Sequence, residues 1–127
     1  TAKNKVLIYA INRMSEAIIL PEPKDHINFD AGKFFEDSFG IYPGKGFQVR
    51  LLFKKELVPY ISERIWHPKQ KSKVLEDGNL LLELPATSLS EIRKFVMSYG
   101  SGVKVLDPPE LIDEIKKTID EMYREYE

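Results

Sequence analysis

Four side chains of this sequence are of the types that bind anions or nucleic-acid bases. Three of them lie in one short stretch, Arg-Ile-Trp-His-Pro at residues 64–68, and the fourth is Arg13. An arginine grips a phosphate through two parallel hydrogen bonds, and an indole ring stacks on a base or a cation. Arg13, Arg64, Trp66 and His67 are therefore candidate ligand-binding residues. The structural alternatives are that Trp66 packs in the core, His67 hydrogen-bonds within its loop and Arg13 is a surface arginine.

Residues suited to catalysis or metal binding are sparse. The chain has no cysteine, which excludes disulfides, thiolate zinc sites and cysteine nucleophiles. His26 and His67 are too far apart for a His-x-x-x-His ligand pair. No Gly-x-Ser-x-Gly elbow is present, and the glycines at 40, 44 and 46 lack the Gly-Lys-Ser/Thr of a phosphate loop. We expect no enzyme, cofactor or metal; an enzymatic site would need a pocket that joins His67 to a carboxylate.

The charges of the chain are unevenly distributed although its net charge is only −1. Residues 45–73 hold eight basic and two acidic side chains, and residues 108–127 hold three basic and seven acidic ones. The basic stretch predicts a surface for an anion or for nucleic acid, with solvated surface charge as the alternative.

Length and composition are those of a compact globular protein. The chain has 127 residues, of which 43% are apolar and 31% charged, as in ordinary folded domains. It contains neither a run of 18 apolar residues nor a signal peptide, so we expect a cytoplasmic protein without a membrane partner. Because the sequence starts without methionine, we also expect that it was cut from a longer chain.

The first 45 residues predict short elements that cannot form a core by themselves. Two apolar runs, 5–11 and 16–20, are typical of strands, and prolines follow the second run. Residues 30–39 predict a helix with Asp30 as its N-cap and Gly40 just after its end. Residues 42–46 are turn material and mark a boundary between residues 1–45 and 46–127.

The centre of the chain is a predicted β-hairpin. Asp77-Gly78 lies between two apolar runs, and a glycine accepts the backbone geometry that a two-residue turn needs. Leu80, Leu82 and Leu84 alternate and so share one fully apolar face that other elements must cover.

The elements around this hairpin define the fold. We expect strands at 47–53, 71–76 and 103–106, and helices at 55–64, 88–99 and from 108 onward. Ser88 and Glu91 predict a capping box, and Pro59 fits a first helical turn. The resulting order βαββαβ is that of an α+β, ferredoxin-like fold, with an extra C-terminal helix.

Several segments together resemble one protein family, the WYL-domain transcriptional regulators of bacteria. The segment Tyr-Ala-Ile-Asn-Arg-Met at 9–14 is similar to the end of the WYL domain. The C-terminal extension called WCX is similar to the segments at 49–53, 63–68, 76–78, 91–92, 99–100 and 105–111. The Trp-Tyr-Leu signature itself is absent, and Asn12 replaces an aspartate.

The resemblance implies a protein that regulates transcription. Residues 1–45 would be the end of an Sm-like WYL barrel and a linker, and residues 46–127 a WCX domain of ferredoxin-like fold. DNA would be bound by an N-terminal helix-turn-helix that this sequence lacks. Arg13 is carried over as a WYL ligand contact.

We therefore expect a non-enzymatic regulatory module that senses a nucleotide, a single-stranded nucleic acid or another anion, forms a homodimer, or does both. The alternative is a purely structural dimerisation module without a ligand. It would pair through the last helix or through the sheet face that carries Leu52 and Leu81.

Overall fold

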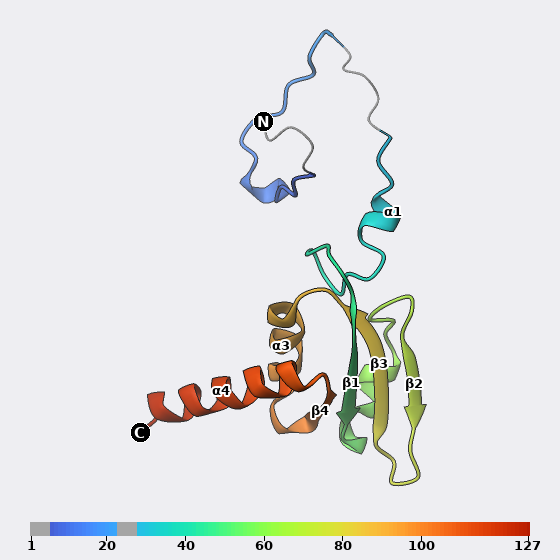
Figure 1. The fold of residues 1–127 in the computed structure, drawn as a ribbon, viewed down its shortest axis with the longest axis vertical. Helices are drawn as coiled ribbons and strands as arrows, with labels where there is room; N and C mark the ends of the chain where they lie inside the picture. Colours follow the sequence, from blue (N-terminus) through green and yellow to red (C-terminus); the bar gives the residue numbers. More distant parts are fainter. Residues whose placement is uncertain (1–5, 23–27) are drawn as a thin grey trace.

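A computed structural model describes residues 6–22 and 28–127, in which a four-stranded sheet is packed against helices (Figure 1). Along the chain the elements are η1 (Ile11–Arg13), α1 (Ala31–Phe34), β1 (Phe47–Phe53), η2 (Lys55–Leu57), α2 (Val58–Ser62), β2 (Lys71–Val74), β3 (Leu80–Ala86), α3 (Leu89–Met97), η3 (Gly100–Gly102), β4 (Val103–Asp107) and α4 (Pro109–Glu125). The predicted α+β class and C-terminal helix are confirmed.

The sheet is antiparallel throughout, with the strand order β2-β3-β1-β4. Strands β2 and β3 form the predicted hairpin. Its turn has Gly78 at φ +84°, and the backbone N–H of Gly78 donates to the carbonyl of Leu75 at 3.0 Å. A residue with a side chain is strained at this φ, which is why a glycine is needed here. The first arm ends at Val74, two residues earlier than predicted.

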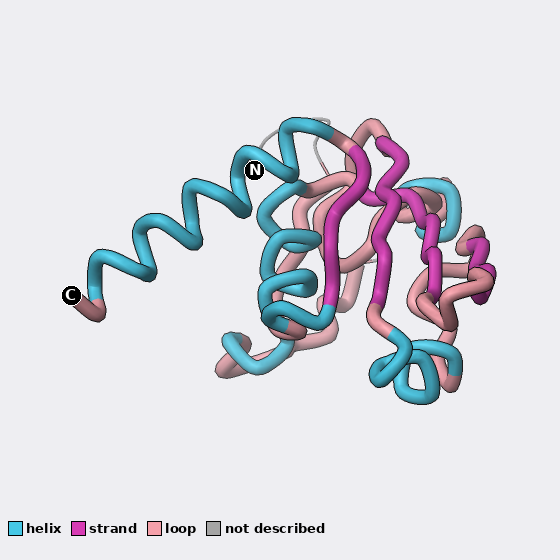
Figure 2. The backbone as a smooth tube through the Cα atoms, turned by 90° about the horizontal axis from the view of Figure 1, so that it is seen from below, coloured by secondary structure: helices cyan, strands magenta, loops and turns pink. Residues whose placement is uncertain are grey.

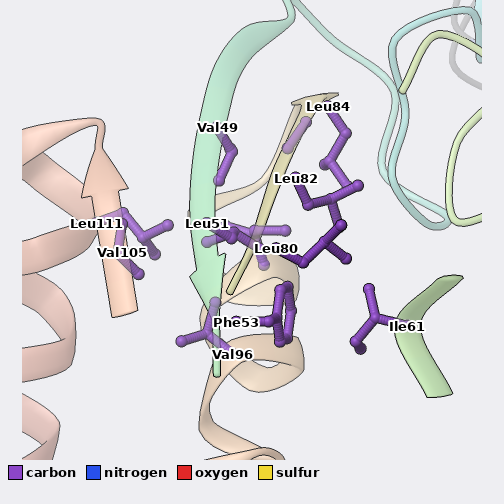
Figure 3. Close-up of a cluster of buried hydrophobic side chains, with 12 residues drawn as sticks. Val49, Leu51, Phe53, Ile61, Leu80, Leu82, Leu84, Val96, Val105 and Leu111 are labelled. Atoms are coloured by element: carbon purple, nitrogen blue, oxygen red, sulfur yellow. The ribbon is translucent and has the colours of Figure 1, made fainter. Parts of the chain in front are cut away.

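One face of the sheet carries the core, because strand side chains alternate between the two faces. In the β1–β3 pairing Val49, Leu51 and Phe53 lie opposite Leu84, Leu82 and Leu80, and all six are buried. Ile61 of α2 and Val96 of α3 pack on this face, and Leu111 of α4 packs beside Val105 of β4 (Figure 3). The helices thus cover the apolar face that the leucine alternation predicted.

Two predicted helices are shorter than expected. The helix predicted at 55–64 is a 3-10 turn, η2, followed by α2, with Pro59 in the first turn of α2 as expected. The helix predicted at 30–39 begins after its Asp30 cap but ends at Phe34, so Gly40 is not its C-terminal glycine. The chain turns there instead, and the N–H of Ser38 donates to the carbonyl of Phe35.

The prediction of a capping box is confirmed for one of its two hydrogen bonds. The Ser88 hydroxyl accepts the N–H of Glu91 at 3.3 Å, as predicted, and α3 begins there. The Glu91 carboxylate, however, does not turn back to Ser88. It accepts the backbone N–H of Ile41 at 2.9 Å, because the segment before β1 lies against the start of α3.

The prediction of two N-terminal strands is wrong for the residues that the structure describes. Residues 6–10 and 16–20 form no strand, and Ile11–Arg13 is a 3-10 turn. A strand needs a partner for its backbone groups, and this segment lies apart from the sheet (Figure 1). Ile19 is therefore 96% exposed. Lys5 and His26 lie outside the described residues.

Removing a core side chain tests the one-sided packing. Leu82→Ala deletes buried methyl groups and should lower the free energy of unfolding by about 2–5 kcal/mol. The control, Leu81→Ala, changes the neighbour on the opposite face and should cost roughly 1 kcal/mol or less. Urea unfolding measures both, and equal losses would contradict a core on one face only.

Candidate functional site

The predicted ligand residues Arg64, Trp66 and His67 lie in the loop between α2 and β2. Gln70 organises this loop, because its side-chain oxygen accepts the N–H of Trp66 at 2.6 Å and that of His67 at 3.2 Å. His67 Nδ1 accepts the N–H of Lys69 at 3.0 Å, so a neutral imidazole carries its proton on Nε2.

The aromatic residues of this loop are packed rather than displayed. His67 is only 3% exposed. The Trp66 ring lies 4.9 Å from that of Phe95, and its Nε1 donates to the carbonyl of Ile61 at 3.1 Å. The Arg64 guanidinium lies 5.6 Å from the centre of the Trp66 ring and remains exposed. These contacts are those of the structural alternative for Trp66 and His67, while ligand binding by the loop stays a prediction.

Arg13 does not join these residues. It ends η1 and lines a separate pocket of about 570 Å³. The other lining residues are Ile8, Tyr9, Ala10, Met14, Ile41 and Tyr42. The four predicted residues therefore belong to two places in the molecule.

Three basic residues of the 45–73 stretch, Arg50, Lys71 and Lys73, lie elsewhere, on the sheet face opposite the core, which we call the open face. In one cross-strand row Lys71, Glu83 and Arg50 lie side by side, and Asp107 follows on β4. In the next row Lys73 and Lys104 flank two half-buried leucines, Leu81 and Leu52. Residues directly opposite each other point to the same side of a sheet. The open face therefore combines four cations, two carboxylates and an apolar centre.

A cleft of about 390 Å³ opens at one end of this face, lined by Gln48, Arg50, Lys69, Lys71 and Glu83. Its charges are partly neutralised. Arg50 Nε donates to Glu83 Oε1 at 3.0 Å. Lys69 Nζ lies 2.8 Å from Asp37 Oδ1 and 3.0 Å from Glu36 Oε1. The bond to Asp37, and then that to Glu36, raises the pKa of Lys69 above its usual 10.5. Lys69 thus carries its charge at all physiological pH values.

The sequence alone did not predict this cleft, because its residues come from three strands and from the loop before β2. Four of the five lining residues lie within the basic stretch 45–73, but Glu83 lies outside it. Only the strand register shows which cations are neighbours.

The described residues contain no group of three or more His, Cys, Asp or Glu side chains placed to hold a metal ion.

The sequence model of the WCX domain family matches residues 45–123, which is more than half of the chain. The chain belongs to the WCX domain family. This domain is the C-terminal extension of WYL-domain regulators, and the match confirms the resemblance of the C-terminal segments to WCX. No curated protein matches the chain. Within the described ranges, no helix of the WCX domain or of the segment before it is long and apolar enough to cross a membrane.

The segment before the WCX domain, residues 28–44, is held against it; we call this segment the linker. Besides Ile41 N–H bonding to Glu91, the Thr87 hydroxyl donates to the carbonyl of Tyr42. The Phe39 ring lies 4.9 Å from that of Phe95. A side chain at position 40 would collide with the Glu91 carboxylate, so Gly40 permits this close approach. Residues 39–42 are thereby fixed on the WCX domain.

Gln70 provides a test of the loop's internal order. Gln70→Ala leaves two backbone N–H groups of a half-buried loop without their acceptor and should cost about 1–3 kcal/mol of unfolding free energy. Gln48→Ala is the matched control on the open face and should change stability by no more than about 0.5 kcal/mol. Urea unfolding followed by the fluorescence of Trp66, the only tryptophan, measures both. If Gln70→Ala left the free energy of unfolding unchanged, the two hydrogen bonds would make no contribution to stability.

Proposed function

We propose that this chain is a non-enzymatic regulatory module of a bacterial WYL-type transcription regulator, and that its WCX domain senses an anionic effector. The effector class is a nucleotide or a single-stranded nucleic acid. The observation that carries the proposal is the open face, where cations from three strands surround two leucines.

The chemistry of the open face suits a phosphodiester chain. Lys71, Lys73 and Lys104 are exposed on β2 and β4. Each lysine that neutralises a phosphate of a single-stranded nucleic acid would release a counterion condensed on that nucleic acid. Leu52 and Leu81 between them offer an apolar surface to sugars or bases. The face has no aromatic side chain for stacking, which favours contacts to the backbone over reading of the base sequence.

We also infer that the domain has the ferredoxin-like, split β-α-β topology. The strand order β2-β3-β1-β4 supports this, because it places the parallel strands β1 and β2 on either side of β3. The helices α2 and α3 follow β1 and β3 and both contribute to the core. In this topology one sheet face stays uncovered, as the open face is here.

Charge removal on β2 tests the site. The double variant Lys71→Gln/Lys73→Gln should weaken binding of a fluorescent single-stranded oligonucleotide, measured by anisotropy at several salt concentrations. Because each lost phosphate contact lowers the salt slope of log K by about 0.7, the slope should fall by roughly 1.4.

The control for this experiment has the same charge change away from the open face: Lys94→Gln/Lys117→Gln on α3 and α4, which should leave the slope unchanged. Arg64→Ala is measured beside it. If Arg64→Ala weakened oligonucleotide binding and the β2 variant did not, the binding site would lie in the 64–70 loop instead.

A second candidate function is homodimerisation through α4. The C-terminal half of α4 projects beyond the domain (Figures 1 and 2). Its apolar stripe is Ile115, Ile119, Met122 and Tyr126, of which Tyr126 is 89% exposed. An apolar groove of about 500 Å³ between α3, β4 and α4 continues this stripe.

A second copy of the chain fits this groove. The charged residues that line it are Lys104 and Lys116. The projecting end of α4 together with the two residues after it, 119–127, carries four acidic side chains and one arginine. An antiparallel pair of α4 helices would therefore bring acidic ends to basic grooves and cover both apolar stripes.

Sedimentation equilibrium tests the pairing. Ile119→Ser/Met122→Ser removes apolar area from the stripe and should raise the dimer dissociation constant at least roughly tenfold. The control Asp113→Ser/Lys117→Ser changes the opposite, exposed side of α4, outside its acidic end, and should leave the constant unchanged. A wild-type chain that stays monomeric at every concentration would rule out this candidate.

A further inference from the structure

The two linker carboxylates at Lys69 lie where an effector phosphate would bind. Lys69 is one of three cations that line the cleft at the end of the open face, with Arg50 and Lys71. Glu36 and Asp37 bring two negative charges to that single cation. One cation of the cleft lining is therefore already paired with carboxylates of the same chain.

The position of Asp37 is built into the backbone. A Cβ at position 46 would lie 2.6–2.8 Å from the Asp37 side chain, so Gly46 leaves the room that this carboxylate occupies. Gly46 directly precedes β1, whose residues Gln48 and Arg50 line the cleft. The carboxylate thus sits beside the cleft as a consequence of local shape as well as charge.

We propose that Glu36 and Asp37 are a built-in competitor for the phosphate groups of the effector. This proposal rests on the proposed function. Without effector the two carboxylates hold Lys69; a phosphate that enters the cleft takes Lys69 from them, and residues 31–37 then separate from the WCX domain.

The linker is attached in a way that permits such a partial release. Ile41 and Tyr42 are held by hydrogen bonds to α3 and Thr87, and Phe39 by its ring contact with Phe95. Among the described ion pairs, those that join the linker to the domain are the two at Lys69. Losing them frees the part that leads toward residues 6–22 and leaves the anchor at 39–42 in place. Effector binding would thereby change how the segment upstream of the WCX domain is held.

The experiment measures binding of a fluorescent single-stranded oligonucleotide of about 12 nucleotides by the full chain. Glu36→Gln/Asp37→Asn removes the competing charges without changing side-chain size. It should tighten binding about three- to tenfold and steepen the salt slope by roughly 0.7, since Lys69 becomes available to a phosphate. Glu56→Gln/Asp113→Asn, at exposed positions of η2 and α4, makes the same change of net charge and should alter affinity less than about twofold.

The decisive comparison repeats both measurements with Lys69→Ala present. If the carboxylates act through Lys69, their removal gains nothing in that background; an equal gain would overturn the proposal in favour of a general charge effect. Hydrogen exchange at Phe34, Phe35 and Ser38, whose amides bond within the linker, should accelerate when oligonucleotide is added to the wild type.

The two possible failures are distinct. If the wild type binds and Glu36→Gln/Asp37→Asn binds no more tightly, the competitor is refuted while the proposed function stands. If neither the wild type nor this variant binds at low salt, the proposed function itself fails. Thermal unfolding of each variant checks its fold, and the replaced side chains lie at the surface.

Discussion

The pairing of β1 with β3 fixes both faces of this domain at once. Leu51 lies opposite Leu82 and Arg50 opposite Glu83, so each row of the ladder contributes either to the core or to the open face. A shift of the pairing by one residue would bury the charges and expose the leucines, and both changes would destabilise the domain. The core therefore stabilises the fold and holds the cations of the open face in register.

Local rules predicted the WCX part of the chain well because its elements are specified by their own residues. The hairpin follows from Asp77-Gly78, and the start of α3 from Ser88. The rules failed where the partner is distant in sequence. Glu91 was assigned to its own helix end but binds Ile41, 50 residues away. The apolar runs near the N-terminus have strand-like composition, yet composition does not say whether a partner strand is present.

The candidate site shows the same limit. Residue type singled out Trp66 and His67, but type does not show that Gln70 and Ile61 already use their polar atoms. The charge of residues 45–73 predicted a basic surface, and three of its cations, Arg50, Lys71 and Lys73, lie on the open face. Which cations meet, and that Lys69 is shared with two carboxylates, depends on the sheet register and on the path of the linker. The assignment of residues 1–45 to the end of a WYL domain remains a prediction.

Strand β2 lies at the edge of the sheet, and all four of its residues are exposed. Its outer side presents unpaired backbone N–H and carbonyl groups, to which the edge strand of another molecule could add. Lysines on such a strand oppose this addition, because stacking two copies would bring like charges together. Lys71 and Lys73 therefore oppose edge-to-edge aggregation of the domain, and this effect of their charge requires no ligand.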